Sequence, residues 1–71
     1  MITAEQITNL KVGQVIGNEQ GEIEIVEIPE WDGKGCAKMR VKYIKNGSGE
    51  EMVDVAAIEG MIEARHVSIL R

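Results

Sequence analysis

The side chains that could perform nucleophilic or metal chemistry are few in this sequence. Cys36 is the only cysteine and His66 is the only histidine. A single cysteine excludes an internal disulfide and a multi-cysteine zinc site. Lys34 and Lys38 lie near Cys36, but lysines in a basic stretch are weak evidence for a reactive thiol, and local spacing reveals no partner that would make His66 a general base or a metal ligand. We therefore expect no catalytic residue, no metal site and no enzymatic activity, and interpret Cys36 as a small residue beside a turn and His66 as a surface residue.

Carboxylates are the most numerous ionisable groups. The chain has 12 Asp and Glu residues, many of them between residues 19 and 30, with a further pair at Glu50-Glu51. Hydrolytic or metal chemistry needs carboxylates that converge in space, which alternating glutamates along a strand do not indicate. Three glycines spaced by four residues have no helix directly after them to bind phosphate, and we interpret them as turns without a cofactor: Gly13, Gly17 and Gly21.

A basic stretch is the third candidate for chemistry. Five of the eight basic residues lie at 34–45, and no acidic residue lies between Gly33 and Gly49. Such a stretch could contact nucleic acid, but the net charge of −4 and the presence of only two aromatic residues oppose this. We favour the alternative that acidic residues on neighbouring strands neutralise a solvated sheet face. The residues available for the nucleic-acid hypothesis are Lys34, Lys38, Arg40 and Lys42.

The elements that position these residues are three consecutive antiparallel strands. In the first, residues 22–28, Ile23 and Ile25 share one face while Ile28 has the opposite parity, which predicts a β-bulge near Val26. The second, residues 36–45, alternates so that four residues face inward: Ala37, Met39, Val41 and Tyr43. The turn residues Trp31 to Gly35 and the bulge together predict these cross-strand pairs: Glu27 with Arg40, Ile25 with Val41, Glu24 with Lys42, and Ile23 with Tyr43.

A second turn, Asn46 to Gly49, leads into the third strand. A loop that closes residue 45 onto residue 51 pairs Tyr43 with Val53, Val41 with Val55, and Lys42 with Asp54, and sets Ile44 beside Met52 on the outer face. Three apolar residues would then be exposed and available for partner contact: Trp31, Ile44 and Met52. Val26 is a further candidate. The alternative is that the N-terminal turn or residues 61–62 cover these side chains within the same chain.

The remaining segments complete a small β fold. Thr3 to Gln6 matches a capping box and, with Ile7 and Leu10, predicts a short helical turn. We expect strands at 14–18 and 65–70, and helical character at 56–62. Five short strands with two helical elements predict a single domain, residues 1–71, folded as a five-stranded, mostly β, SH3-like barrel whose closure removes the edge strands.

The length and composition of the chain bear on the size of its core and on its cellular compartment. A chain of 71 residues has a small core, so association would help its stability. No apolar run approaches the roughly 18 residues that a membrane helix needs, and no secretory signal is recognisable. We therefore expect a cytoplasmic location and no contact with a membrane.

The layout resembles the SH3-like small barrels through the opening Leu10-Lys11-Val12-Gly13-Gln14-Val15-Ile16, the bent second strand and the helical turn before the last strand. The run Asp54-Val55-Ala56-Ala57-Ile58-Glu59 is similar to Pro-Val-Ala-Ala-Leu-Glu of the plasmid-borne type II dihydrofolate reductases. In that family a preceding Val-Gln-Ile-Tyr segment lines the pore of a homotetramer. The matching positions here, Glu50 to Val53, lack the glutamine and the tyrosine, so the resemblance implies the fold and oligomerisation but not reductase activity.

Small size, acidic balance and the lack of catalytic motifs favour a non-enzymatic cytosolic protein-binding module, acting as an inhibitor or adaptor of a larger partner or binding itself as a homo-oligomer, most simply a dimer. Its contact surface would be a sheet face or an exposed strand edge. One alternative is a nucleic-acid-associated barrel that uses the basic strand at 34–45. Another is a small-ligand binder whose pocket lies between subunits.

Overall fold

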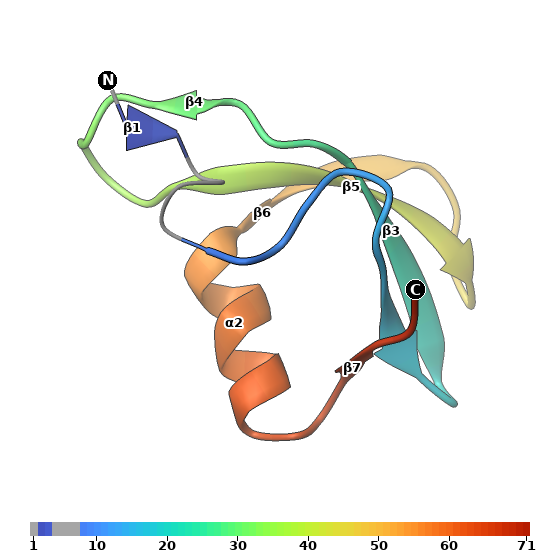
Figure 1. Ribbon diagram of the computed structural model, residues 1–71. Coiled ribbons are helices and arrows are strands. Elements are labelled where there is room, and N and C mark those ends of the chain that lie inside the picture. Colours follow the sequence, from blue (N-terminus) through green and yellow to red (C-terminus); the bar gives the residue numbers. More distant parts are fainter. Residues whose placement is uncertain (1, 4–7) are drawn as a thin grey trace.

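The computed structural model describes residues 2–3, by their backbone, and residues 8–71. The described part is mostly β, with a five-stranded antiparallel sheet and one helix against one face of it (Figure 1). The elements of this unit are β2 (Val15–Asn18), β3 (Gly21–Glu27), β5 (Lys38–Lys45), β6 (Glu50–Asp54), α2 (Val55–Glu63) and β7 (Ser68–Ile69). A separate two-stranded ribbon, which was not predicted, pairs β1 (Ile2–Thr3) with β4 (Glu30–Trp31).

The pairing of β3 with β5 confirms the predicted register. Glu27 lies opposite Arg40, and the register shifts between Ile25 and Glu27, where the bulge was expected. The next pairs also match the prediction: Ile25 with Val41, Glu24 with Lys42, and Ile23 with Tyr43. A second shift, between Glu22 and Ile23, was not predicted and lets β5 continue to Lys45.

The predicted register between β5 and β6 is wrong by four residues, because Lys42 lies opposite Glu50 and not opposite Asp54. The cause is the position of the loop, which is closed by Tyr43 and Gly49 and not by residues 45 and 51. Tyr43 N–H donates to Gly49 O at 2.9 Å, and the segment between them turns through Asn46, whose φ is 61°. Since side chains in a strand alternate with a period of two, this slip changes the neighbours of each side chain but not the face on which it lies.

The helix starts directly where β6 ends. Val55, which was expected to continue the strand, is the first residue of α2, and its N–H donates to Ala37 O at 2.9 Å. The predicted helical segment at 56–62 is therefore confirmed with slightly wider bounds. At the other end Arg65 has a left-handed φ of 64°, Arg65 N–H donates to Ile62 O, and His66 N–H donates to Met61 O. This Schellman-type ending occupies residues that were expected in the last strand, which shortens β7 to two residues.

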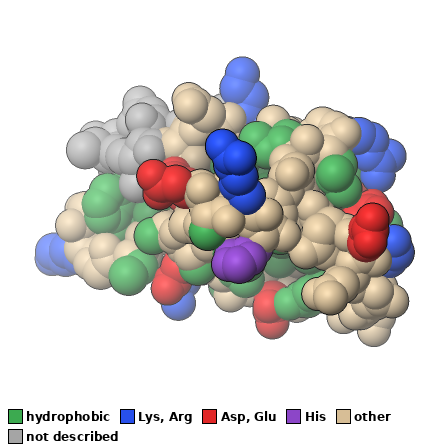
Figure 2. Space-filling model, turned by 90° about the horizontal axis from the view of Figure 1, so that it is seen from below, with side chains coloured by type: hydrophobic (Ala, Val, Ile, Leu, Met, Phe, Trp, Pro, Cys, Tyr) green, Lys and Arg blue, Asp and Glu red, His purple; other side chains and the backbone are tan. Residues whose placement is uncertain are grey.

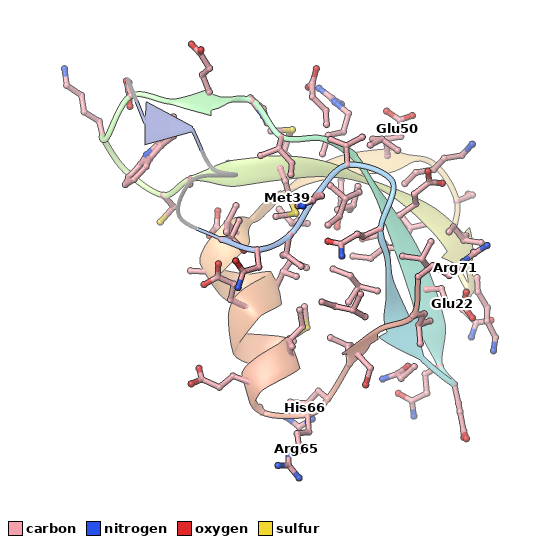
Figure 3. The ribbon with its side chains drawn as sticks, in the orientation of Figure 1. Glu22, Met39, Glu50, Arg65, His66 and Arg71 are labelled. Carbon is pink, nitrogen blue, oxygen red and sulfur yellow. The ribbon has the colours of Figure 1, made fainter. Side chains whose placement is uncertain are left out.

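The core lies between the sheet and α2. Met39 and Val41 of β5 are both 0% exposed, which confirms their predicted inward direction, and Ile58 of α2 packs against the same cluster at 2%. Figure 3 shows Met39 pointing from β5 into this space. The remaining buried apolar residues are Leu10, Val15, Ile16, Ile25, Ala37 and Val55. Burial of these side chains is the main stabilising term for so small a sheet.

The strand order is β6-β5-β3-β2-β7, and within the described residues β6 and β7 are the two edges. The final strand returns beside the first, with Ile69 opposite Ile16, but it does not pair with β6. The predicted closure into a barrel is therefore not formed by strand pairing within residues 2–3 and 8–71, where β6 and β7 each pair with one strand only. Residues 4–7 of the helical turn predicted from Thr3 to Leu10 lie outside the described residues; Thr3 ends β1, and residues 8–10 are not helical, so this part of the prediction is wrong.

Candidate functional site

The outer edge of β6 carries backbone groups that no described strand pairs with. Tyr43 N–H donates to Gly49 O, and every second residue after Gly49 repeats this orientation, so Glu51 and Val53 direct their backbone groups toward β5. Glu50 and Met52 consequently direct their N–H and C=O groups away from the sheet. An edge of this kind can accept a further strand by main-chain hydrogen bonds.

The side chains of β6 are acidic on both faces. On the outer face Asp54 forms an ion pair with Lys38 at 3.8 Å, Met52 is 39% exposed, and Glu50 lies opposite Lys42. Figure 3 shows Glu50 on the side of the sheet away from α2. Glu51 is on the inner face, so negative charge borders the free edge above and below the sheet.

Glu51 is held by Tyr43, whose hydroxyl donates a hydrogen bond to Glu51 Oε1. This bond raises the pKa of Tyr43, since it stabilises the neutral phenol; burial and the negative charge of Glu51 act in the same direction. Gly47 is packed against the tyrosine ring, because a Cβ at that position would lie 3.0 Å from a ring carbon. The loop between β5 and β6 thus positions Tyr43, and Tyr43 positions the carboxylate beside the edge.

A cavity of about 380 Å³ lies behind this pair, between the inner face of the sheet and the last turns of α2. Its walls are mostly apolar, and Glu51 is the only charged side chain among the described residues that line it. β6 contributes Glu51 and Val53 to the lining of this cavity, and β5 contributes Tyr43. Ile58 and Met61 of α2 line it from the opposite side. The edge and the cavity therefore share one strand.

The predicted partner-contact residues do not form a common surface. Ile44 and Met52 are both exposed, at 43% and 39%, but Met52 lies opposite Arg40. Ile44 lies four residues beyond Arg40 on β5, which separates the two positions by about 13 Å at the rise of a β-strand. Trp31 is half-buried against the core rather than exposed, and its Nε1–H donates to Lys34 O at 3.1 Å. Val26 is half-buried as well.

The basic residues proposed for nucleic acid are interleaved with carboxylates. Arg40 Nε lies 3.6 Å from Glu27 Oε1, which confirms the predicted pair. Lys42 lies opposite Glu24 on β3 and opposite Glu50 on β6. Lys34 is exposed in the loop before β5. Figure 2 views the molecule from the side of α2, opposite this outer face, and there too small hydrophobic areas lie between charged side chains of both signs. Nucleic-acid binding stays a prediction that this charge distribution does not favour.

Other candidate residues lie apart from the edge. Cys36 and His66 are both exposed, and His66 contributes its carbonyl oxygen to Asn18 Nδ2–H at 2.8 Å, which ties the loop after α2 to the turn after β2. Within residues 2–3 and 8–71, no group of three or more His, Cys, Asp or Glu side chains is placed to bind a metal ion. The helix in this part of the chain is too short to cross a membrane.

Sequence reasoning located β6 and its faces but not its edge position, because it assumed that the sheet closes. The acidic run Glu50-Glu51 directly before the helix was the available signal, but it was considered only as a hydrolytic or metal site and rejected as one. Comparisons of the chain with known protein families, with curated proteins and with solved structures found no match.

Proposed function

We propose that the chain is a non-enzymatic cytoplasmic protein-binding module, which receives an extended segment of a partner protein along the outer edge of β6. One observation carries this proposal: Glu50 and Met52 direct their backbone groups to an edge that no described strand covers. Main-chain hydrogen bonds would supply affinity, and the side chains beside the edge would supply specificity. An inhibitor or adaptor of a larger protein could use this mode of binding.

We propose further that the fold is an open relative of the SH3-like barrels. The order β7-β2-β3-β5-β6, with a helix before the last strand, supports this assignment. The positions that resemble the pore segment of the type II dihydrofolate reductases form β6 itself. A strand that contacts other chains in that family would here contact a different partner.

Proline substitution at the edge provides a sharp test. Met52 N–H points away from the sheet, so Met52→Pro removes an outward donor while the ladder to β5 keeps its hydrogen bonds. Met52→Thr is the matched control, since it changes the side chain but keeps the N–H. Short linear peptides selected from a random display library on the wild-type protein should bind Met52→Thr and lose binding to Met52→Pro. Each variant is first checked for wild-type circular dichroism.

Two results would contradict the proposal. One is that no linear peptide is enriched on the wild-type protein. The other is that enriched peptides bind folded Met52→Pro with unchanged affinity, which would place their contact away from the edge of β6.

A second candidate function is the binding of a small apolar ligand, favoured by the cavity of about 380 Å³ beneath β6. This cavity lies within one chain, unlike the expected pocket between subunits. Met61 lines it and is 37% exposed, so Met61→Trp should fill it without unfolding the protein. A thermal-shift screen of apolar fragments should then give stabilising compounds for the wild type that have no effect on Met61→Trp. If no compound stabilises the wild type, this second candidate fails.

Self-association stays a prediction, but its expected surface is absent because Ile44 and Met52 are not neighbours. The small core remains its motivation.

A further inference from the structure

We infer that the segment received by β6 is basic, with the five-residue order basic, apolar, apolar, basic, basic from its N-terminus to its C-terminus. This inference rests on the proposed function, because it assigns the side chains of a strand added at the same edge. It follows from the direction of pairing, the carboxylates of β6 and the apolar wall beside them.

Antiparallel pairing fixes which side chains meet. All the strands of the sheet pair antiparallel, and an added strand in the same mode would run from the end of β6 toward its start. Its first residue would face Asp54 and its last would face Glu50. Residues opposite Glu51 and Val53 would lie on the inner face, and the residue opposite Met52 would lie on the outer face.

The carboxylates select the three basic positions. No ion pair within the described residues involves Glu50 or Glu51, and Asp54 has only a 3.8 Å contact with the exposed Lys38. Glu51 is also fixed in place by the Tyr43 hydroxyl, so a cation opposite it would meet an ordered carboxylate. Opposite charges on directly facing positions stabilise a strand pair, and like charges destabilise it.

The two apolar positions follow from the neighbours of the edge. Val53 lines the cavity with Met61, so an aliphatic side chain opposite Val53 would cover apolar surface at the cavity wall. The residue opposite Met52 would cover a side chain that is 39% exposed. Burial of such surface favours binding in proportion to the area removed from water.

A second copy of this chain is a poor occupant of the same edge. Pairing two β6 strands about Met52 would set Glu50 of each copy opposite Asp54 of the other. Two like-charge contacts in one short ladder oppose the dimer. Charge complementarity therefore favours a foreign basic strand.

Defined peptides test the inference. The probe is a synthetic peptide, blocked at both ends, with the core Lys-Val-Val-Lys-Lys between neutral flanks, titrated by isothermal calorimetry at low and high salt. We expect binding that weakens as salt is raised. Peptides with the core Glu-Val-Val-Glu-Glu or Lys-Ser-Ser-Lys-Lys should bind at least about tenfold more weakly, since each loses more than one contact of the order of 1 kcal/mol.

Matched variants of the protein separate charge from fold. Glu50→Gln and Glu51→Gln should each lower the affinity for the Lys-Val-Val-Lys-Lys peptide by about two- to fivefold, the range expected for loss of an exposed ion pair. Glu30→Gln makes the same charge change on β4, at an exposed position, and should leave binding unchanged.

The outcomes distinguish the inference from the function on which it rests. Equal binding of the acidic peptide, or unchanged affinity in the double variant Glu50→Gln with Glu51→Gln, overturns the basic partner even if Met52→Pro still abolishes binding. Failure of the basic peptide to bind while library peptides do bind overturns it as well. If the basic peptide binds folded Met52→Pro normally, both the inference and the proposed edge site are wrong.

Discussion

Truncation of Ile58 is expected to remove a large part of the stability of this domain. Ile58 is 2% exposed and connects α2 to the sheet core. Ile58→Ala deletes three carbons, a loss of about 2.4 kcal/mol at roughly 0.8 kcal/mol for each buried methylene. The void left behind adds to this, so we expect a total of about 3 kcal/mol within the usual range of about 2 to 5 kcal/mol.

The magnitude matters because the domain is small. At roughly 0.05–0.15 kcal/mol per residue, a chain of 71 residues has a free energy of unfolding of about 4 to 11 kcal/mol. Ile58→Ala would therefore remove between about a quarter and most of it. Urea denaturation can measure this through Trp31, the only tryptophan, which is half-buried against the core and should change its fluorescence on unfolding.

Ile44→Ala is the matched control, since it deletes the same carbons from a side chain that is 43% exposed. We expect a loss below about 1 kcal/mol for this variant. Equal losses for Ile44→Ala and Ile58→Ala would refute the packing of α2 on the sheet, as would a loss below about 1 kcal/mol for Ile58→Ala.

Further predictions concern the sheet and the Tyr43–Glu51 pair. Val41→Asp should unfold the domain, since it buries a carboxylate at a site that is 0% exposed, whereas Lys42→Ala should cost under about 1 kcal/mol; thermal melts that coincide would contradict the assignment of faces. Tyr43 is the only tyrosine, so an ultraviolet titration reports its pKa. This pKa should fall toward about 10 in Glu51→Gln. An unchanged pKa in that variant would exclude the hydrogen bond from Tyr43 to the Glu51 carboxylate. Because the folded-state pKa is raised, the stability from this pair is complete below about pH 10 and declines as pH rises through the folded-state value. Gly47→Ala should lower the same pKa by displacing the ring, and it would leave the titration unaltered if the loop does not position Tyr43.

The sequence was sufficient to predict the register of β3 on β5, because the alternation of apolar residues changes phase within β3. Ile23 and Ile25 on one parity and Ile28 on the other required a bulge, and the bulge with the turn at residues 31–35 determined the register of β3 on β5. The inward set that includes Met39 and Val41 followed from alternation alone.

The register of β6 could not be obtained in the same way. A slip of four residues preserves the alternation, so the hydrophobic pattern is equally satisfied whether Lys42 faces Asp54 or Glu50. The loop conformation decides between them, through the left-handed Asn46 and the bond from Tyr43 N–H to Gly49 O. Met52 was among the predicted contact residues, but the edge on which it lies was not identified, because that edge depends on which backbone groups of β6 remain unpaired and not on residue types.

Residue-resolved amide hydrogen exchange tests the edge site most directly. In the free protein the amides of Glu50 and Met52 should exchange rapidly, while those of Glu51 and Val53, which point toward β5, should be protected. Addition of the Lys-Val-Val-Lys-Lys peptide at saturation should slow exchange at Glu50 and Met52. If the peptide binds and these two amides still exchange as in the free protein, strand addition at β6 is contradicted.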